Sequence, residues 1–242
     1  MIPTDLKLLA VKLGLAPLLI TQGRRVRATT PRLAEAAGAR QGRQGKGKHK
    51  LRLLILGDSA AAGCGIDHQH HALAGRILAC FSPQWQVDWE LVAQSGRTTA
   101  RTLDALERLP ARPVDAVVTS LGVNDVKNGV SLGRWLDQQQ ALIQLLTHKF
   151  QARHILITAV PPMDKFPALP GILGWYLGHC AAAFNRALEA RIRPIPHCRF
   201  IAPELPLDPA LMAADGFHPG KGVHILWGKQ IHASLMEMMA GA

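Results

Sequence analysis

Cysteine is scarce in this 242-residue chain, and its spacing does not match the common structural zinc sites. The four cysteines, which include no Cys-x-x-Cys pair, are Cys64, Cys80, Cys180 and Cys198. An exported protein could join them in two disulfides, but without an export signal we expect reduced, mostly buried thiols. The histidine-rich stretch Asp67–His71 is more typical of a surface loop leading into a helix than of a metal site. The sequence therefore indicates no metal and no cofactor.

The sequence also lacks an uninterrupted apolar run of about 20 residues, the length that spans a bilayer. Its best candidate, Leu6–Ile20, contains Lys7 and Lys12 and is interrupted by Pro17. Arginines follow this stretch, which makes it a poor secretory signal. Two interpretations stay open: an amphipathic helix on an anionic membrane surface, or a helix docked on this domain or on a partner. We expect a cytoplasmic protein, with peripheral membrane contact through residues 1–32 under the first interpretation.

Acidic residues are few at the start of the chain. Residues 1–50 hold 2 acidic residues against 11 lysines and arginines, whereas the remainder holds 15 against 17. The net charge of +11 therefore belongs mainly to a leader, and we expect a nearly neutral globular domain over residues 51–242. Within the leader, Gly38–Lys50 is glycine-rich and basic, which predicts a mobile linker. It has no aromatic residue on which a base could stack, so nucleic-acid binding is not favoured.

Predicted strands and helices alternate from residue 51 onward. The expected strands are Leu51–Leu56, Trp85–Ala93, Val114–Leu121, His154–Val160 and Arg199–Ala202. The expected helices are Ala72–Cys80, Thr98–Leu109, Ser131–Phe150, Cys180–Ile192 and Val223–Met239. This alternation predicts an α/β fold, with a parallel sheet covered by helices on both faces. Met163–Leu177 is unusually apolar for a loop, and it either walls an acyl pocket, acts as a lid or packs on the core.

Three residues that suit acyl transfer follow the ends of consecutive strands. Ser59, Gly96 and Asn124 should meet at one edge of a parallel sheet, because the carboxyl ends of its strands share that edge. A serine there can be a nucleophile, while a bare backbone N–H and a side-chain amide can stabilise an oxyanion. Asp215 and His218, three residues apart in a late loop, can supply an orienting carboxylate and a base.

Each of these residues has an ordinary structural alternative. Ser59 could be only a helix N-cap, Gly96 only a turn glycine and Asn124 only a turn former. Likewise, His218 could be a surface histidine. Their joint appearance in this order, at sheet edges and in the final loop, favours a catalytic site.

The blocks Gly57-Asp58-Ser59, Gly96, Gly122-x-Asn124-Asp125 and Asp215-x-x-His218 resemble those of the SGNH (GDSL-type) hydrolase superfamily. The resemblance extends from about Leu51 to the C-terminus and implies a flavodoxin-like three-layer α/β/α sandwich with a five-stranded parallel sheet. It implies Ser59 as nucleophile, His218 as base and Asp215 as its orienting partner. It also implies an oxyanion hole made of the Ser59 and Gly96 N–H groups and the Asn124 side chain.

This resemblance predicts a serine esterase or lipase that acts on a small-molecule or lipid ester, with a lean towards lipophilic acyl groups. The motifs do not choose among lipid, aryl, thio- and acetyl esters. Two alternatives stay open: an acyltransferase that uses the same residues, and a non-catalytic, membrane-associated binding protein. The resemblance implies nothing about the leader.

Overall fold

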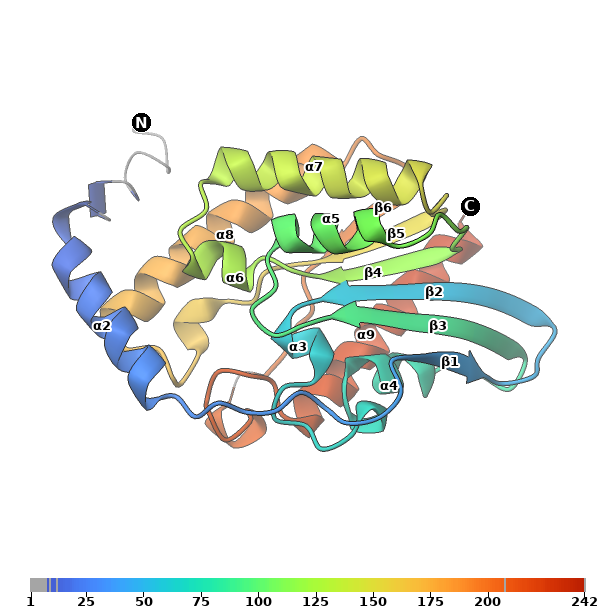
Figure 1. Cartoon of the computed structure of the whole chain (residues 1–242), viewed down its shortest axis with the longest axis horizontal. Helices are drawn as coiled ribbons and strands as arrows, with labels where there is room; N and C mark the ends of the chain where they lie inside the picture. Colours follow the sequence, from blue (N-terminus) through green and yellow to red (C-terminus); the bar gives the residue numbers. More distant parts are fainter. Residues whose placement is uncertain (1–7, 9, 12, 207, 242) are drawn as a thin grey trace.

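A six-stranded mixed sheet organises the computed structural model, which describes residues 8, 10, 11, 13–206 and 208–241 (Figure 1). The strand order is β1-β3-β2-β4-β5-β6. The strands are β1 (Gln41–Gln44), β2 (His49–Gly57), β3 (Trp85–Ala93), β4 (Ala116–Ser120), β5 (His154–Thr158) and β6 (Cys198–Ile201). Strands β2 to β6 pair in parallel, as predicted, and β1 adds an antiparallel edge.

Two layers of helices bury the two faces of the sheet. Alternate residues of β2 belong to different cores: Leu54 and Leu56 pack on one face, and Leu53 and Ile55 on the other. The first face is covered by α5 (Thr99–Arg108), α7 (Leu132–His148) and α8 (Gly171–Ile192). The second is covered by α3 (Ser59–Ala62), α4 (Leu73–Leu78) and α9 (Lys221–Ala240). The continuous apolar runs of β2 and β4 reflect this double burial, and the three-layer prediction is confirmed.

The register of the central strands aligns their carboxyl ends. Gly57, the last residue of β2, is paired with Ala93 at the end of β3 and with Ser120 at the end of β4. The loops that follow these three strands therefore leave the sheet side by side. This is the edge of an open α/β sheet at which ligands usually bind.

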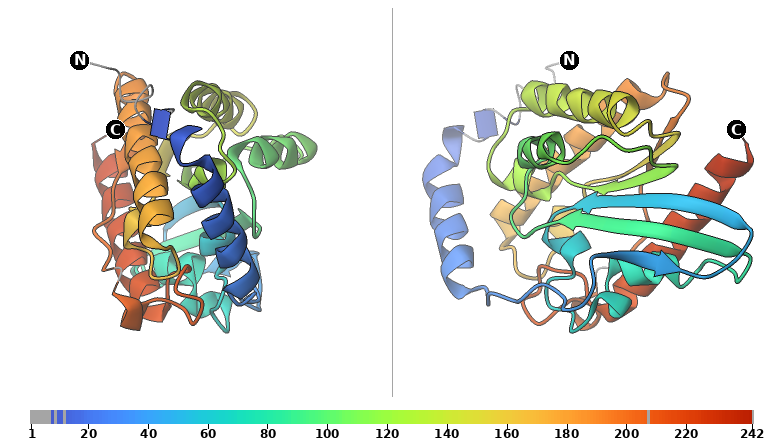
Figure 2. Two further views of the ribbon diagram at one scale, coloured as in Figure 1. Left: turned by 90° about the vertical axis from the view of Figure 1, so that its left-hand side faces the viewer. Right: turned by 45° about the vertical axis from the view of Figure 1, so that its right-hand side comes forward.

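Helix α2 (Ala16–Thr29) lies beyond this edge, at the left in Figure 1 and in front in the left panel of Figure 2. Its Leu19 is buried in the core, and Gln22 accepts a hydrogen bond from the N–H of Leu173 on α8 at 3.0 Å. The expected helix Leu6–Ile20 lies partly outside the described residues. The described part of the leader helix is thus docked on its own chain.

The prediction of a mobile linker over Gly38–Lys50 is wrong. Gln41–Gln44 forms β1, which pairs with β3, and His49 begins β2. All four residues of β1 are exposed, and Arg43 binds Asp88 of β3 at 2.6 Å. Because an exposed edge strand needs no apolar alternation, its sequence carries no strand signal.

The prediction of an apolar loop over Met163–Leu177 also needs correction. Only Met163–Lys165 forms a 3-10 turn, and α8 begins at Gly171, nine residues before the predicted start. The first turns of α8 contain glycine, which hides the helix in the sequence. A Cβ atom at Gly178 would come within 2.6 Å of the Asp164 carboxylate, so this glycine lets the turn pack on the helix.

The cysteines differ in burial. Cys64 is buried, whereas Cys80, Cys180 and Cys198 are partly exposed, so the expected burial holds for one of four. The Sγ atom of Cys64 lies 3.3 Å from the hydroxyl of Ser95. Among the described residues, no group of histidine, cysteine and acidic side chains is arranged to hold a metal ion.

Candidate active site

Ser59 occupies the first position of α3, directly after the turn that ends β2. The preceding Asp58 is the N-cap, and its Oδ1 accepts from the N–H of Ala60 at 3.0 Å. Gly57 is required because a Cβ there would lie 2.3 Å from the side chain of Ala61. The alternative of Ser59 as a mere N-cap is therefore wrong, and its hydroxyl is available for another partner.

That partner is His218. The Ser59 hydroxyl lies 2.9 Å from Nε2 of His218, and the His218 Nδ1 lies 2.5 Å from Oδ2 of Asp215. The other oxygen of Asp215 accepts the N–H groups of Phe217 and His218, both at 3.0 Å. The structure thus brings three residues from the two ends of the domain into one hydrogen-bonded chain.

The Asp215 carboxyl is held in its ionised form. Burial acts to raise its pKa, but the hydrogen bonds from His218 and Phe217 outweigh burial and leave the pKa below its ordinary value. An ionised carboxylate on Nδ1 holds the imidazole with Nε2 facing Ser59 and can stabilise an imidazolium.

Asn124, on α6 (Val123–Lys127), joins the two neighbouring loops. Its Nδ2 donates to Oδ2 of Asp58 at 3.2 Å and to the carbonyl of Arg97 at 3.1 Å. Arg97 follows Gly96, so the predicted oxyanion residues come from loops that are bonded to one another. The roles of Gly96 and Asn124 as oxyanion donors stay predictions.

The motif glycines Gly96 and Gly122 both need a left-handed backbone. Gly96 has φ +76° and Gly122 has φ +122°, where side-chain-bearing residues are rare. At Gly122 a Cβ would also lie 2.5 Å from Val160, whereas at Gly96 nothing lies within 4 Å. The open space around Gly96 suits close approach of a substrate.

Two buried carboxyls, Asp58 and Asp125, support the site, and the sequence analysis gave neither a role. Burial raises the pKa of each to about 6, although hydrogen bonds from Ala60 and Thr99 respectively oppose the rise. Asp125 accepts from the N–H and the hydroxyl of Thr99 at 3.1 to 3.2 Å. It therefore ties the loop after β4 to the start of α5, just beyond Gly96. The sequence marks Asp58 and Asp125 only by their positions inside the motif blocks.

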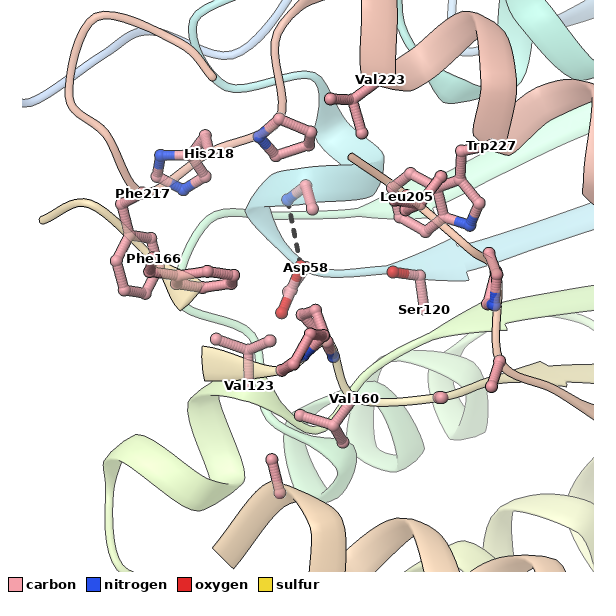
Figure 3. A pocket seen from close by; sticks show the side chains of 18 of the residues that line it. Asp58, Ser120, Val123, Val160, Phe166, Leu205, Phe217, His218, Val223 and Trp227 are labelled. Atoms are coloured by element: carbon pink, nitrogen blue, oxygen red, sulfur yellow. Dashed lines mark hydrogen bonds between the residues drawn. The ribbon is translucent and has the colours of Figure 1, made fainter. Parts of the chain in front are cut away.

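An apolar cavity of about 380 Å³ opens beside Ser59 and His218. Figure 3 shows Phe166 and Phe217 on the side of His218, with Leu205 and Trp227 opposite. Phe166 and Asp164 are the residues of the predicted apolar segment that line the cavity. Trp227 was not predicted, although its spacing of four from Val223 places both on one face of α9.

The fold and the geometry of this site define a three-layer α/β protein of the hydrolase class, with a serine, a histidine and an aspartate aligned at the sheet edge. The model of the GDSL-like Lipase/Acylhydrolase family matches residues 55–224. The chain belongs to this family. No curated protein matches it at a significant level.

Solved structures of esterases and lipases share the fold. The lipase Lip_vut3 from a goat rumen metagenome superposes with a TM-score of 0.60 at 15% identity, covering 76% of this chain and 97% of that chain. The psychrotrophic esterase EstA from Pseudoalteromonas sp. gives 0.54 at 21% identity, covering 78% and 98%. A carbohydrate acetylesterase family member from Sinorhizobium meliloti gives 0.57 at 20% identity, covering 78% and 99%. At these identities the similarity shows a shared fold only, and it does not identify the substrate of this chain.

Proposed function

We propose that the protein is a serine esterase that hydrolyses carboxylic esters through Ser59, His218 and Asp215. The observation that carries this proposal is the continuous hydrogen-bonded chain from the Ser59 hydroxyl through His218 to the buried Asp215. Family membership supports a hydrolase, and this chain supplies the nucleophile and base that such chemistry needs.

The reaction follows from the positions of these atoms. Ser59 Oγ attacks the ester carbonyl carbon while its proton passes to Nε2 of His218, and Asp215 stabilises the imidazolium. The tetrahedral intermediate collapses as the imidazolium returns that proton to the departing alkoxide, which leaves as an alcohol. Water then gives a proton to Nε2 of His218 as it adds to the acyl-enzyme. Collapse of the second tetrahedral intermediate returns that proton to Ser59 Oγ and releases the acid.

The negative oxygen of each tetrahedral intermediate needs donors. We assign this role to the N–H groups of Ser59 and Gly96 and to the Asn124 amide, as the family resemblance implies. Both amide hydrogens of Asn124 have acceptors, Asp58 and Arg97. The oxyanion must therefore replace one of these two acceptors when it forms.

The cavity beside Ser59 supports a substrate with a lipophilic acyl group, which would occupy this cavity. Its walls are mostly apolar, and its volume of about 380 Å³ suits an aliphatic chain. Initial rates on p-nitrophenyl esters of increasing chain length test this assignment. An acyltransferase would instead form a new ester or amide when an alcohol or amine is added, which product analysis would reveal.

The leader supports a further part of the proposal, contact with an anionic lipid surface. Ile20, Arg24 and Arg27 lie on one side of α2, turned away from the buried Leu19, and all three are exposed. On α8, Trp175 lies two residues beyond Leu173, which donates to Gln22 of α2, and its ring is 43% exposed. An outward face that combines cations with apolar side chains fits anionic headgroups, which attract basic residues to the bilayer surface. No helix among the described residues meets the length and hydropathy needed to cross a bilayer.

This face lies close to the candidate site. Desolvation lowers the pKa of Lys127 on α6, the Asp58 carboxylate opposes this, and the positive charge of Arg27 adds to the lowering, so Arg27 lies within electrostatic range of Lys127. The Nζ atom of Lys127 lies 5.8 Å from the ring centre of Phe217, the neighbour of His218. A protein held on a bilayer by α2 would therefore present the site towards lipophilic esters.

Co-sedimentation of the full chain with phosphatidylcholine vesicles, with and without phosphatidylglycerol, tests this contact. The double substitution Arg24→Gln and Arg27→Gln should weaken binding to the anionic vesicles about thirtyfold, since each basic residue adds about 1 kcal/mol. The matched control, Arg101→Gln with Arg108→Gln, removes the same charge from exposed positions of α5. Equal binding to neutral and anionic vesicles, or an equal loss of binding in the control variant, would reject the contact.

A further inference from the structure

The turn that carries Gly96 has little packing of its own. Gln94, Ser95 and Gly96 are exposed, and within the turn Arg97 N–H donates to the carbonyl of Gln94 at 3.1 Å. The direction of the Gly96 N–H depends on the orientation of the Ser95–Gly96 peptide. Because packing does not fix this peptide, polar contacts must hold it in place.

Glu35, in the leader, makes a polar contact with the adjoining Gln94–Ser95 peptide. Its Oε1 accepts from the N–H of Ser95 at 2.5 Å, and its Oε2 accepts from Arg40 at 2.5 Å. Arg40 in turn donates to the carbonyl of Ala93, the last residue of β3, at 2.7 Å. The Glu35–Arg40 ion pair therefore holds Ala93 at the end of β3 and Ser95 in the turn that follows.

The chemistry of Glu35 suits this contact. Burial acts to raise its pKa, but the hydrogen bonds from Ser95 and the pairing with Arg40 outweigh burial and leave the pKa below its ordinary value. The carboxylate is therefore ionised at neutral pH. A charged acceptor holds a backbone N–H more strongly than a neutral one.

The segment around Glu35 is anchored to the helix of the candidate nucleophile. The N–H of Ala36 donates to the carbonyl of Ala62 in α3 at 3.2 Å, and Gly65 N–H donates to the carbonyl of Ala34 at 2.9 Å. The side chain of Gln69 donates to the carbonyls of both Ala36 and Ala62. Since Ala36 is also buried, the segment forms a fixed bridge between α3 and the turn after β3.

We propose that Glu35 is a positioning residue of the active site: it holds the Gln94–Ser95 peptide, and this fixes the adjoining Ser95–Gly96 peptide so that the Gly96 N–H faces the oxyanion. The leader would then complete the site, although it lies outside residues 55–224, which match the family. This inference rests on the proposed esterase function and on the oxyanion role of Gly96.

The test compares Glu35→Ala and Glu35→Gln with the wild type on p-nitrophenyl acetate. Losing an oxyanion donor outright costs about 10²- to 10³-fold in kcat, so misaligning one should cost about 10- to 100-fold, with KM nearly unchanged. Glu35→Gln keeps an oxygen that can accept from Ser95 and should lose less. The matched control is Asp88→Asn, which breaks the ion pair of β3 with Arg43 away from the turn and should leave kcat unchanged.

A second measurement separates positioning from general loosening of the fold. A boronic acid that adds to Ser59 forms a tetrahedral adduct with a charged oxygen, so its inhibition constant should rise in Glu35→Ala by the factor that kcat falls. Unchanged kcat and unchanged boronate inhibition in Glu35→Ala would overturn the inference, as would equal losses in Asp88→Asn. Absence of both turnover and serine labelling in the wild type would instead reject the esterase function itself.

Discussion

The side-chain amide of Asn124 donates to the buried carboxyl of Asp58 at 3.2 Å. This bond joins the loop after β4 to the turn that presents Ser59, and it explains why a carboxyl is tolerated in a fully buried position. It also means that the amide is aligned beside the candidate nucleophile before any substrate arrives. The amide then exchanges one of its two acceptors, Asp58 or Arg97, for the oxyanion when the tetrahedral intermediate forms.

Asn124→Ala should lower kcat by about 10²- to 10³-fold and change KM little, because the amide acts on charge that develops in the transition state. Steady-state kinetics on a short soluble ester measure both constants. Asn128→Ala, at an exposed position at the end of α6, is the control and should behave as the wild type. A defect mainly in KM would show that Asn124 binds ground-state substrate.

Asp58 should make the protein less stable as pH rises. Its pKa in the folded state is raised by burial from 3.8 to about 6, so between these values the folded protein binds more protons than the unfolded chain. The free energy of unfolding therefore falls across this window, by about 3 kcal/mol from this group. Urea denaturation of the wild type and Asp58→Asn at several pH values measures it. The difference in stability between the two should shift in favour of the variant as pH rises from 4 to 7, and a constant difference would contradict the assignment.

Ser59 and His218 should behave as one unit. Ser59→Ala and His218→Ala should each lower kcat by about 10⁴-fold or more, and the double variant should be no worse than either alone. Asp215→Asn removes the charge that orients the imidazole and should cost less than either. Measuring kcat of each folded variant on the same ester tests whether the two residues are coupled. A double variant that loses the product of the single losses would show that the residues act independently.

Leu205→Trp should shorten the acyl chains that the protein accepts. Leu205 lies beside Trp227 in the cavity wall, and a larger ring there fills space that a chain would occupy (Figure 3). Each buried methylene contributes about 0.8 kcal/mol, so the ratio of kcat/KM for octanoate over acetate should fall at least about tenfold. Leu211→Trp, at an exposed position outside the cavity lining, is the control. An unchanged ratio would mean that the acyl chain lies elsewhere.

The regular elements of the catalytic domain could be predicted because their apolar patterns are local. The expected strand Trp85–Ala93 matches β3 residue for residue, and Ser131–Phe150 contains α7. The start of α8 was missed because glycines and Pro170 disguise its first turns. Strand β1 was missed because it is polar, exposed and defined by its partner β3.

The residues of the candidate site could likewise be predicted only in part. Ser59, His218 and Asp215 lie in motif blocks whose order along the chain predicts their meeting, and the structure brings these three together. Glu35 could not be predicted, since a single glutamate in a basic leader has no pattern, and its partner Ser95 lies 60 residues away. The division of the chain at residue 50 stays a prediction, although β1 joins the leader to the sheet.

Labelling with a fluorophosphonate tests the central claim most directly, because this probe reacts with an activated serine and leaves a covalent adduct. The account predicts one adduct per chain, mapped by peptide mass to Ser59, absent from Ser59→Ala and formed far more slowly by His218→Ala. An adduct on a different serine, or no adduct on a protein that hydrolyses esters, would contradict it.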